Sequence, residues 1–122
     1  MQFDFKTFAV FAAKAYNELG ESPYTLDDVL SVFDCYFQTY EDRMNEPHPF
    51  LKLEQIKRIV KIMPYLSLNT HGDVDIEPEA YPAIIDQHFQ TQYRNCDYNI
   101  NHFFSGTIRE LRYYERVYFA TD

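Results

Sequence analysis

Glycine is scarce in this chain, and its scarcity limits how much sheet the chain can form. The 122 residues include three glycines, Gly20, Gly72 and Gly106. Sheets need many tight turns, and glycine supplies the positive φ angles that such turns use. Apolar residues instead recur at helical spacing between proline and glycine stops. We therefore expect one mostly α domain over residues 1–122, with five or six helices and at most a short β pair.

The clearest helix is expected over residues 26–43. Thr25 precedes it and can accept hydrogen bonds from the free amides of the first turn, while Asp27 suits the positive end of the helix dipole. This helix has the widest apolar face of the chain, so we expect it to be central in the fold. Phe33 and Phe37 lie in the middle of that face and are predicted to be core residues.

The remaining helices are expected over residues 4–19, 51–63, 80–92, 98–104 and 107–118. Gly20 can end the helix over 4–19, and Asp97 can cap the short helix over 98–104. Thr107 opens a T-x-x-E capping box at the start of the last helix. Between the third and fourth helices, Val74 and Ile76 alternate with acidic residues, which predicts either a short edge strand or an extended acidic loop.

The composition is that of a folded chain without a membrane span. Apolar residues make up 46% of the sequence and charged residues 25%, and there are 11 Phe and 11 Tyr. Such a chain can bury a core, which excludes intrinsic disorder. No apolar run of about 18 residues and no export signal is visible, so we expect a cytoplasmic location and reduced thiols at Cys35 and Cys96.

Charge is unevenly distributed along the chain. The formal net charge of −8 argues against a protein that coats nucleic acid by neutralising phosphates. The helix expected over 51–63 is nonetheless basic, with Lys52, Lys57, Arg58 and Lys61. Its cations can complement neighbouring acidic helices, which we favour, or they can contact nucleic acid or an acidic partner. The acidity of the whole chain also leaves open an acidic DNA mimic that inhibits a nucleic-acid enzyme.

The last two expected helices have the outline of a helix-turn-helix. A short helix is followed by a turn at 105–107 and then by a helix that bears Arg109, Arg112 and Arg116. The register argues against a standard DNA reader. Asn101 and His102 fall where the first helix of the motif should pack, and Arg112 falls where the second should be apolar. A DNA-binding regulator using this helix or the basic helix over 51–63 is therefore kept as the alternative function.

Neither zinc nor calcium is predicted, and no cofactor is expected. The potential zinc ligands are His88, Cys96, Asp97 and His102, but there is no C-x-x-C pair, and His88 lies on an apolar face where a hydrogen-bonded core histidine is the common outcome. The acidic run is Asp73, Asp75, Glu77 and Glu79. Pro78 stands in that run where a calcium loop needs glycine.

Catalytic motifs are also absent from the sequence. Cys96 and His102 could form a nucleophile and its base, but no flanking signature supports this, and a small buried thiol is the favoured interpretation. The chain has neither G-x-x-x-x-G-K nor G-x-G-x-x-G. We therefore do not expect an enzyme.

The leading prediction is a non-enzymatic module that acts by docking on another protein. Tyrosine and arginine dominate the energetics of protein interfaces, and the C-terminal third concentrates both. The candidate interaction surface consists of Tyr93, Arg94, Tyr98, Arg109, Arg112, Tyr113, Tyr114 and Arg116. The alternative for about half of these rings is a place in the core, and the sequence defines neither the partner nor the oligomeric state.

The segment from Tyr93 to Gly106 and the following run from Ile108 to Glu115 resemble a segment of small, uncharacterised bacterial proteins of mobile elements. The resemblance covers the C-terminal part of the chain alone. It implies an accessory role in a bacterial mobile element or phage, and it brings no activity, ligand or functional residue with it.

Overall fold

Helices make up the fold almost entirely. The computed structural model describes residues 4–66, 74–105 and 107–119, with side chains through Arg116. Within these ranges the elements are α1 (Phe5–Leu19), α2 (Leu26–Met44), α3 (Leu53–Ile62), the 3-10 turn η1 (Pro78–Ala80), α4 (Tyr81–Gln90), α5 (Ile100–Phe103) and α6 (Ile108–Phe119). No strand occurs in the ranges described, so the prediction of a mostly α fold with five or six helices is confirmed.

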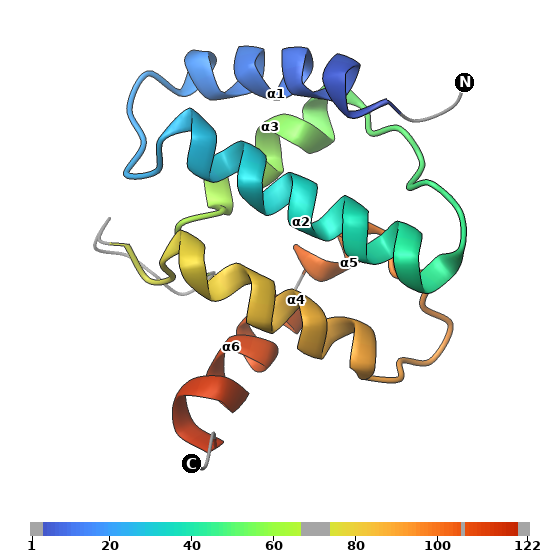
Figure 1. The fold of residues 1–122 in the computed structure, drawn as a ribbon. Helices are drawn as coiled ribbons and strands as arrows, with labels where there is room; N and C mark the ends of the chain where they lie inside the picture. Colours follow the sequence, from blue (N-terminus) through green and yellow to red (C-terminus); the bar gives the residue numbers. More distant parts are fainter. Residues whose placement is uncertain (1–3, 67–73, 106, 120–122) are drawn as a thin grey trace.

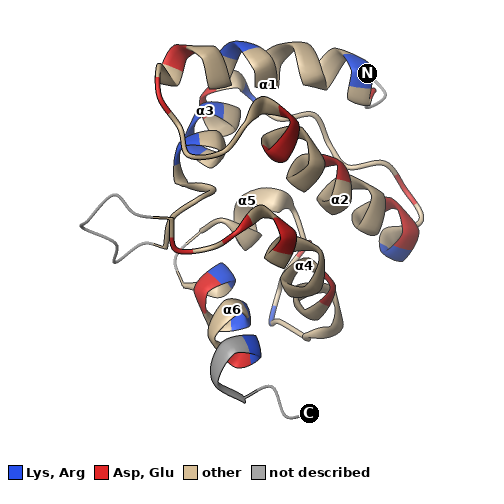
Figure 2. Ribbon diagram, turned by 60° about the vertical axis from the view of Figure 1, so that its left-hand side comes forward, with Lys and Arg blue, Asp and Glu red and all other residues tan. Residues whose placement is uncertain are grey.

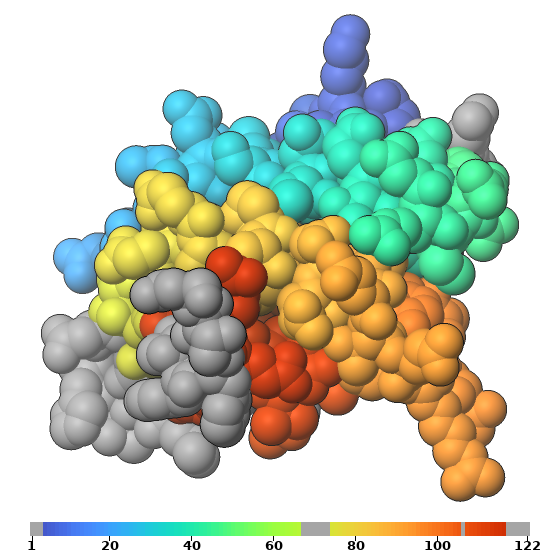
Figure 3. Space-filling view, turned by 60° about the horizontal axis from the view of Figure 1, so that its bottom comes forward, coloured from blue at the N-terminus to red at the C-terminus, as the bar shows by residue number. Residues whose placement is uncertain are grey.

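Helix α2 lies in the middle of the molecule, with α1 on one side and α4 on the other (Figure 1). α3 packs beneath α1, and α6 packs against α4 and α5 at the opposite end. The space-filling view shows α2 and α4 side by side, with part of α6 set against α4 (Figure 3). The helices therefore pack as two groups, α1 to α3 and α4 to α6, and the contact between α2 and α4 joins the groups.

Local sequence explains where the first two helices begin and end. Thr25 Oγ1 accepts from the Asp28 amide at 3.1 Å, and Asp28 Oδ2 accepts from the Thr25 amide at 2.9 Å, so the predicted cap is a complete capping box. Gly20, at φ 79°, donates its amide to the Asn17 carbonyl and ends α1 as expected.

One local expectation, the cap of α5, needs correction. Asn99, not Asp97, caps α5, and its side chain accepts from the Asn101 amide at 2.9 Å. Tyr98 has a positive φ of 58°, which turns the chain between Asp97 and the helix, so Asp97 accepts instead from the Asn99 amide at 3.0 Å. Of the two alternatives predicted for the segment around Ile76, a strand or a loop, the structure has the loop, and the amides of Asp75 and Ile76 donate to the Pro64 carbonyl.

Aromatic rings fill the core between α1 and α2. Phe33 is fully buried and Phe37 is 5% exposed, which confirms both as core residues. The Phe8 ring of α1 makes edge-on contacts with both, at centroid distances of 4.8 and 4.9 Å. Aromatic pairs in this geometry add to the free energy gained by burying their area. These rings hold α1 on α2.

The linker between α2 and α3 is anchored by His48, which is 1% exposed. Its Nε2 accepts from the Ile100 amide at 2.9 Å, and its Nδ1 lies 2.7 Å from the Pro49 carbonyl oxygen. Nδ1 is therefore the protonated nitrogen of a neutral ring. Burial lowers the pKa of His48 to about 4, which is consistent with that neutral form.

Candidate functional site

Arg109, predicted at the surface, lies in the interior with 3% of its area exposed. Its Nη1 donates to the carbonyls of Ile62 and Met63 at 3.0 and 3.2 Å and to the Tyr81 hydroxyl at 2.8 Å. Its guanidinium also lies 5.1 Å from the centre of the Phe104 ring. The prediction that Arg109 belongs to an interaction surface is wrong, because its donors bind the end of α3 and the start of α4.

Arg112 is also internal, at 8% exposed. Nη1 donates to Thr91 Oγ1 at 2.9 Å and to the Tyr93 hydroxyl at 3.3 Å, and Nη2 forms an ion pair with Glu115 at 2.9 Å. The cation is therefore neutralised by its own helix and is not available to a partner. Its assignment to the interaction surface is wrong, because it is buried and its donors bind Thr91, Tyr93 and Glu115 of the same chain.

The other predicted surface residues do not form one exposed cluster. Arg94 and Arg116 are exposed, whereas Tyr93, Tyr98, Tyr113 and Tyr114 are half-buried. The Tyr98 hydroxyl donates to the Thr91 carbonyl at 2.6 Å, and its ring stacks on Phe89 at 5.4 Å. Tyr93 and Tyr98 are thus partly committed to packing α4, α5 and the loop between them.

The basic residues of α3 are partly engaged by the chain itself. Lys57 Nζ lies 2.9 Å from Glu18 Oε2 of α1, and Arg58 Nη2 donates to the Phe104 carbonyl at 2.9 Å. The hydrogen bond that Lys57 donates to Glu18 raises the pKa of Lys57. Lys52 and Lys61 remain exposed. Figure 2 shows the basic segments of α3 beside α1, an arrangement that supports the interpretation of internal charge complementarity.

His88 is a buried core histidine, as predicted, and none of its area is exposed. Nδ1 lies 2.9 Å from the Tyr93 hydroxyl, while Nε2 has no hydrogen-bond partner in the part of the chain that is described. Burial, aided by His102 and Arg112, lowers the pKa of His88 to about 3. The ring is neutral at physiological pH.

The structure brings Cys96 and His102 into contact. Cys96 Sγ lies 2.8 Å from His102 Nδ1, although the sequence offered no motif that predicts this pairing. In the ranges with defined positions, no group of three or more His, Cys, Asp or Glu side chains is arranged to hold a metal ion. Asp73, the first residue of the acidic run considered for calcium, lies outside the described residues.

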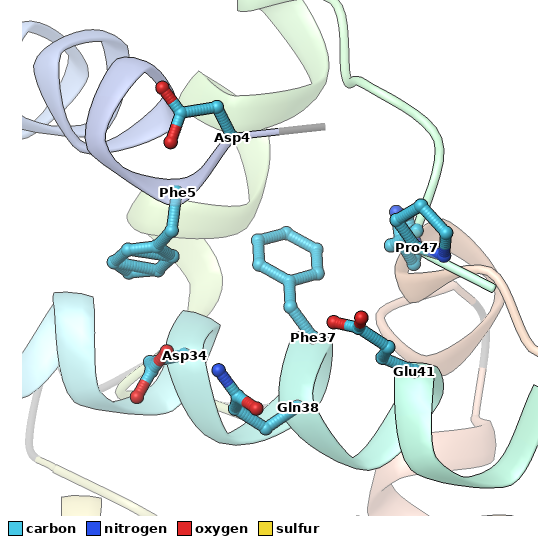
Figure 4. A pocket seen from close by; sticks show the side chains of 8 residues that line it. Asp4, Phe5, Asp34, Phe37, Gln38, Glu41 and Pro47 are labelled. Carbon is cyan, nitrogen blue, oxygen red and sulfur yellow. The ribbon is translucent and has the colours of Figure 1, made fainter. Parts of the chain in front are cut away.

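An acidic pocket with an aromatic floor lies between α1, α2 and the linker after α2. It has a volume of about 240 Å³ and is lined by Asp4, Phe5, Asp34, Phe37, Gln38, Glu41, Pro47 and His48. Figure 4 shows the Phe5 and Phe37 side chains between the two helices, with the three carboxylates spaced around them. We call this the acidic pocket.

The carboxylates of the acidic pocket differ in how they are held. Asp4 accepts from the Thr7 hydroxyl at 2.9 Å and from the Lys6 amide at 3.2 Å, and the Thr7 hydroxyl is the main reason that the pKa of Asp4 is lowered. Asp34 and Glu41 are exposed and form no ion pair within the ranges described. Their negative charge is therefore available to a cation entering the pocket.

Sequence reasoning missed the acidic pocket because its walls are distant in the chain. Asp34, Gln38 and Glu41 recur at helical spacing on α2, and this signal was visible. Their position beside Phe5 and Pro47 depends on how α1 and the linker pack on α2, which a single sequence does not reveal.

Comparison with known proteins gave no match to a family, to a curated protein or to a solved structure. Within the described residues, no helix combines the length and apolar character that crossing a membrane requires.

Proposed function

We propose that this protein is a non-enzymatic docking module, and that it binds a basic segment of another protein by taking a lysine or arginine side chain into the acidic pocket. The observation that carries the proposal is the pocket itself, in which two carboxylates without an ion pair among the described residues, Asp34 and Glu41, flank an aromatic floor. The net charge of −8 adds a long-range attraction for a basic partner.

The pocket matches the two parts of a long cationic side chain. The apolar stem can lie along Phe5 and Phe37, whose ring centroids are 6.4 Å apart, while the charged head meets the carboxylates at the rim. Pockets for drug-sized ligands and cofactors usually exceed roughly 300 Å³. A volume of about 240 Å³ therefore favours one side chain over a bound cofactor.

This proposal keeps the docking function expected from the sequence and changes the surface that performs it. The C-terminal set supplies fewer anchors, because Arg109 and Arg112 are buried. A role for the protein as an accessory factor of a bacterial mobile element remains part of the proposal and rests on the sequence resemblance alone.

A DNA-binding regulator is supported less well by the contacts described above. Of the four α3 cations, Lys57 and Arg58 already have partners within the chain. An acidic DNA mimic would instead use many carboxylates over a broad face, so neutralising one of them would change its affinity little. The effect of single substitutions in the pocket therefore separates docking from mimicry.

The test is a titration of the ¹⁵N-labelled protein with short peptides that carry arginine in a neutral glycine-serine background. We expect amide shifts to concentrate at Asp34, Gln38 and Glu41, and we expect the variants Asp34→Asn and Glu41→Gln to weaken binding several-fold. The control is Asp42→Asn, which removes an exposed carboxylate of the same helix that does not line the pocket. Equal losses in all three variants would show non-specific attraction and contradict the proposal.

A further inference from the structure

The thiol of Cys96, in the loop before α5, lies in direct contact with the imidazole of His102, within α5, and neither residue lines the acidic pocket. Cys96 Sγ is 2.8 Å from His102 Nδ1, and both residues are half-buried, so the pair is partly open to solvent. The His102 ring is held edge-on to the Tyr93 ring, with centroids 5.3 Å apart and an interplanar angle of 89°. The imidazole is therefore fixed with Nδ1 toward the sulfur.

The surroundings of the sulfur favour deprotonation during a reaction. The backbone N–H of Tyr98 donates to Cys96 Sγ at 3.1 Å, and this hydrogen bond strengthens as negative charge develops on sulfur. Burial raises the pKa of the Cys96 thiol, so the resting sulfur is protonated and needs a base before it can attack. His102 Nδ1, 2.8 Å from the sulfur, is placed to accept that proton.

We propose that Cys96 is a nucleophilic thiol with His102 as its base, and that it reacts with low-molecular-weight disulfides to form a mixed disulfide. The Cys96 sulfur attacks one sulfur of the disulfide, a new S–S bond forms, and the original S–S bond breaks. The Cys96 proton passes to His102 Nδ1 and then to the departing thiolate. Cys96 is oxidised, and the released half of the disulfide is reduced to a thiol.

The hydrogen-bond donor at the Cys96 sulfur favours thiol–disulfide exchange over acyl transfer. Acyl transfer needs preorganised hydrogen-bond donors for the oxyanion that develops on a carbonyl. The amide of Tyr98 is directed to the sulfur itself, where it stabilises a thiolate. Thiol–disulfide exchange needs a thiolate and access to it, and no oxyanion forms. The contacts at Cys96 therefore fit exchange with a disulfide better than transfer of an acyl group.

Cys35 provides an internal reference for this reaction. It is also a half-buried free thiol whose pKa is raised by burial. Its side chain has no contact with an imidazole in the described ranges, and it lies on α2. Any difference in reactivity between the two thiols therefore reports what His102 and Tyr98 contribute at Cys96.

The experiment measures the second-order rate of reaction with 2,2′-dithiodipyridine at neutral pH, followed by the absorbance of the released pyridinethione. The single-cysteine variants Cys35→Ser and Cys96→Ser isolate the two thiols, and each is measured folded and in concentrated urea. We expect folded Cys96 to react about tenfold or more faster than the same thiol in the unfolded chain, because a positioned base typically contributes at least about 100-fold and partial burial offsets some of that gain. We expect folded Cys35 to react more slowly than its unfolded form.

Adding His102→Gln to the Cys35→Ser background should reduce the rate at Cys96 at least about tenfold, while the circular dichroism spectrum stays that of the folded protein. If this variant unfolds, the comparison of folded and unfolded Cys96 decides the question alone. The proposal is overturned if folded Cys96 reacts no faster than the unfolded thiol, or if a folded His102→Gln variant keeps the original rate.

Discussion

The Arg109 guanidinium lies 2.8 Å from the hydroxyl of Tyr81, which itself donates to the Met63 carbonyl that also accepts from Arg109. A cation and a phenol thus share one carbonyl where α3, α4 and α6 meet. Both side chains are buried, and removing either one would take a hydrogen-bond partner from the other and from the shared Met63 carbonyl.

We expect Arg109→Ala to lower the free energy of unfolding by about 3 kcal/mol, since hydrogen bonds from a charged group contribute roughly 1.5–3 kcal/mol each and are not additive. Urea unfolding followed by circular dichroism measures the change. The control is Arg116→Ala on the same helix, where an exposed side chain should cost less than about 0.5 kcal/mol. Equal midpoints for the two variants would contradict the structural role assigned to Arg109.

Phe33→Ala and Phe37→Ala should each cost about 3–5 kcal/mol, because each removes a buried ring and leaves a cavity against Phe8. Denaturant midpoints give the measurement. Val10→Ala is the matched control on α1, where 68% of the side chain is exposed and the expected loss is small. Wild-type midpoints for both phenylalanine variants would show that the core lies elsewhere.

Stability should fall as the pH falls from about 6.5 to about 4. Burial lowers the pKa of His48 to about 4 in the folded chain, whereas in the unfolded chain the ring titrates near 6.5. In that window the unfolded state binds a proton that the folded state does not, so each pH unit removes up to about 1.4 kcal/mol of stability per such histidine. His88, with a pKa lowered to about 3, adds to the same trend.

The variant His48→Gln tests this attribution, since an amide oxygen can still accept from Ile100 while the ring's titration is removed. Its stability at neutral pH will be lower, but its loss between pH 7 and pH 5 should be smaller than that of the wild type. Urea unfolding at a series of pH values provides the comparison. Parallel pH profiles would rule out His48 as a source of the effect.

We expect this protein to bind duplex DNA weakly. Replacing Lys52 and Lys61 should change the affinity no more than replacing two other exposed lysines does. Fluorescence anisotropy with a labelled mixed-sequence duplex at low and moderate salt measures this. A true phosphate reader would lose affinity steeply with salt, and each neutralised contact would reduce the slope by about one. Tight binding that is lost on replacing Lys52 and Lys61, but kept on replacing Lys6 and Lys14 of α1, would favour the DNA-binding alternative.

Chelation should leave the melting temperature unchanged, because the sequence spacing around Cys96 and His102 predicts no zinc requirement. Metal analysis of the purified protein, followed by thermal unfolding with and without a chelator, provides the measurement. A stoichiometric ion whose removal lowers the melting temperature would show that a metal completes the fold.

The helices and their caps could be predicted from the sequence because both depend on neighbouring residues. Thr25 and Gly20 act within one turn of the helices they begin or end. The failures involve contacts between distant residues. The buried Arg109 donates to carbonyls that lie 46 and 47 residues earlier in the chain, and no local sequence pattern distinguishes it from a solvated arginine.

The candidate sites follow the same division. The burial of His88 could be predicted from its place on an apolar helix face. The contact between Cys96 and His102 could not, because the spacing of six residues crosses the left-handed turn at Tyr98 before α5 begins. That turn, rather than any motif, brings the sulfur to the imidazole.

The hydrogen bonds of Arg109 also constrain the order in which the fold can be completed during synthesis. The carbonyls that end α3 are made when the ribosome reaches Ile62 and Met63, but their charged donor is translated 46 or more residues later. Until then, the Tyr65 amide can bind the Ile62 carbonyl and the Tyr81 hydroxyl can bind the Met63 carbonyl, but the charged donor is missing. A nascent chain paused after α4 but before α6 would therefore expose to chaperones the face of α4 that α6 later covers, together with the end of α3.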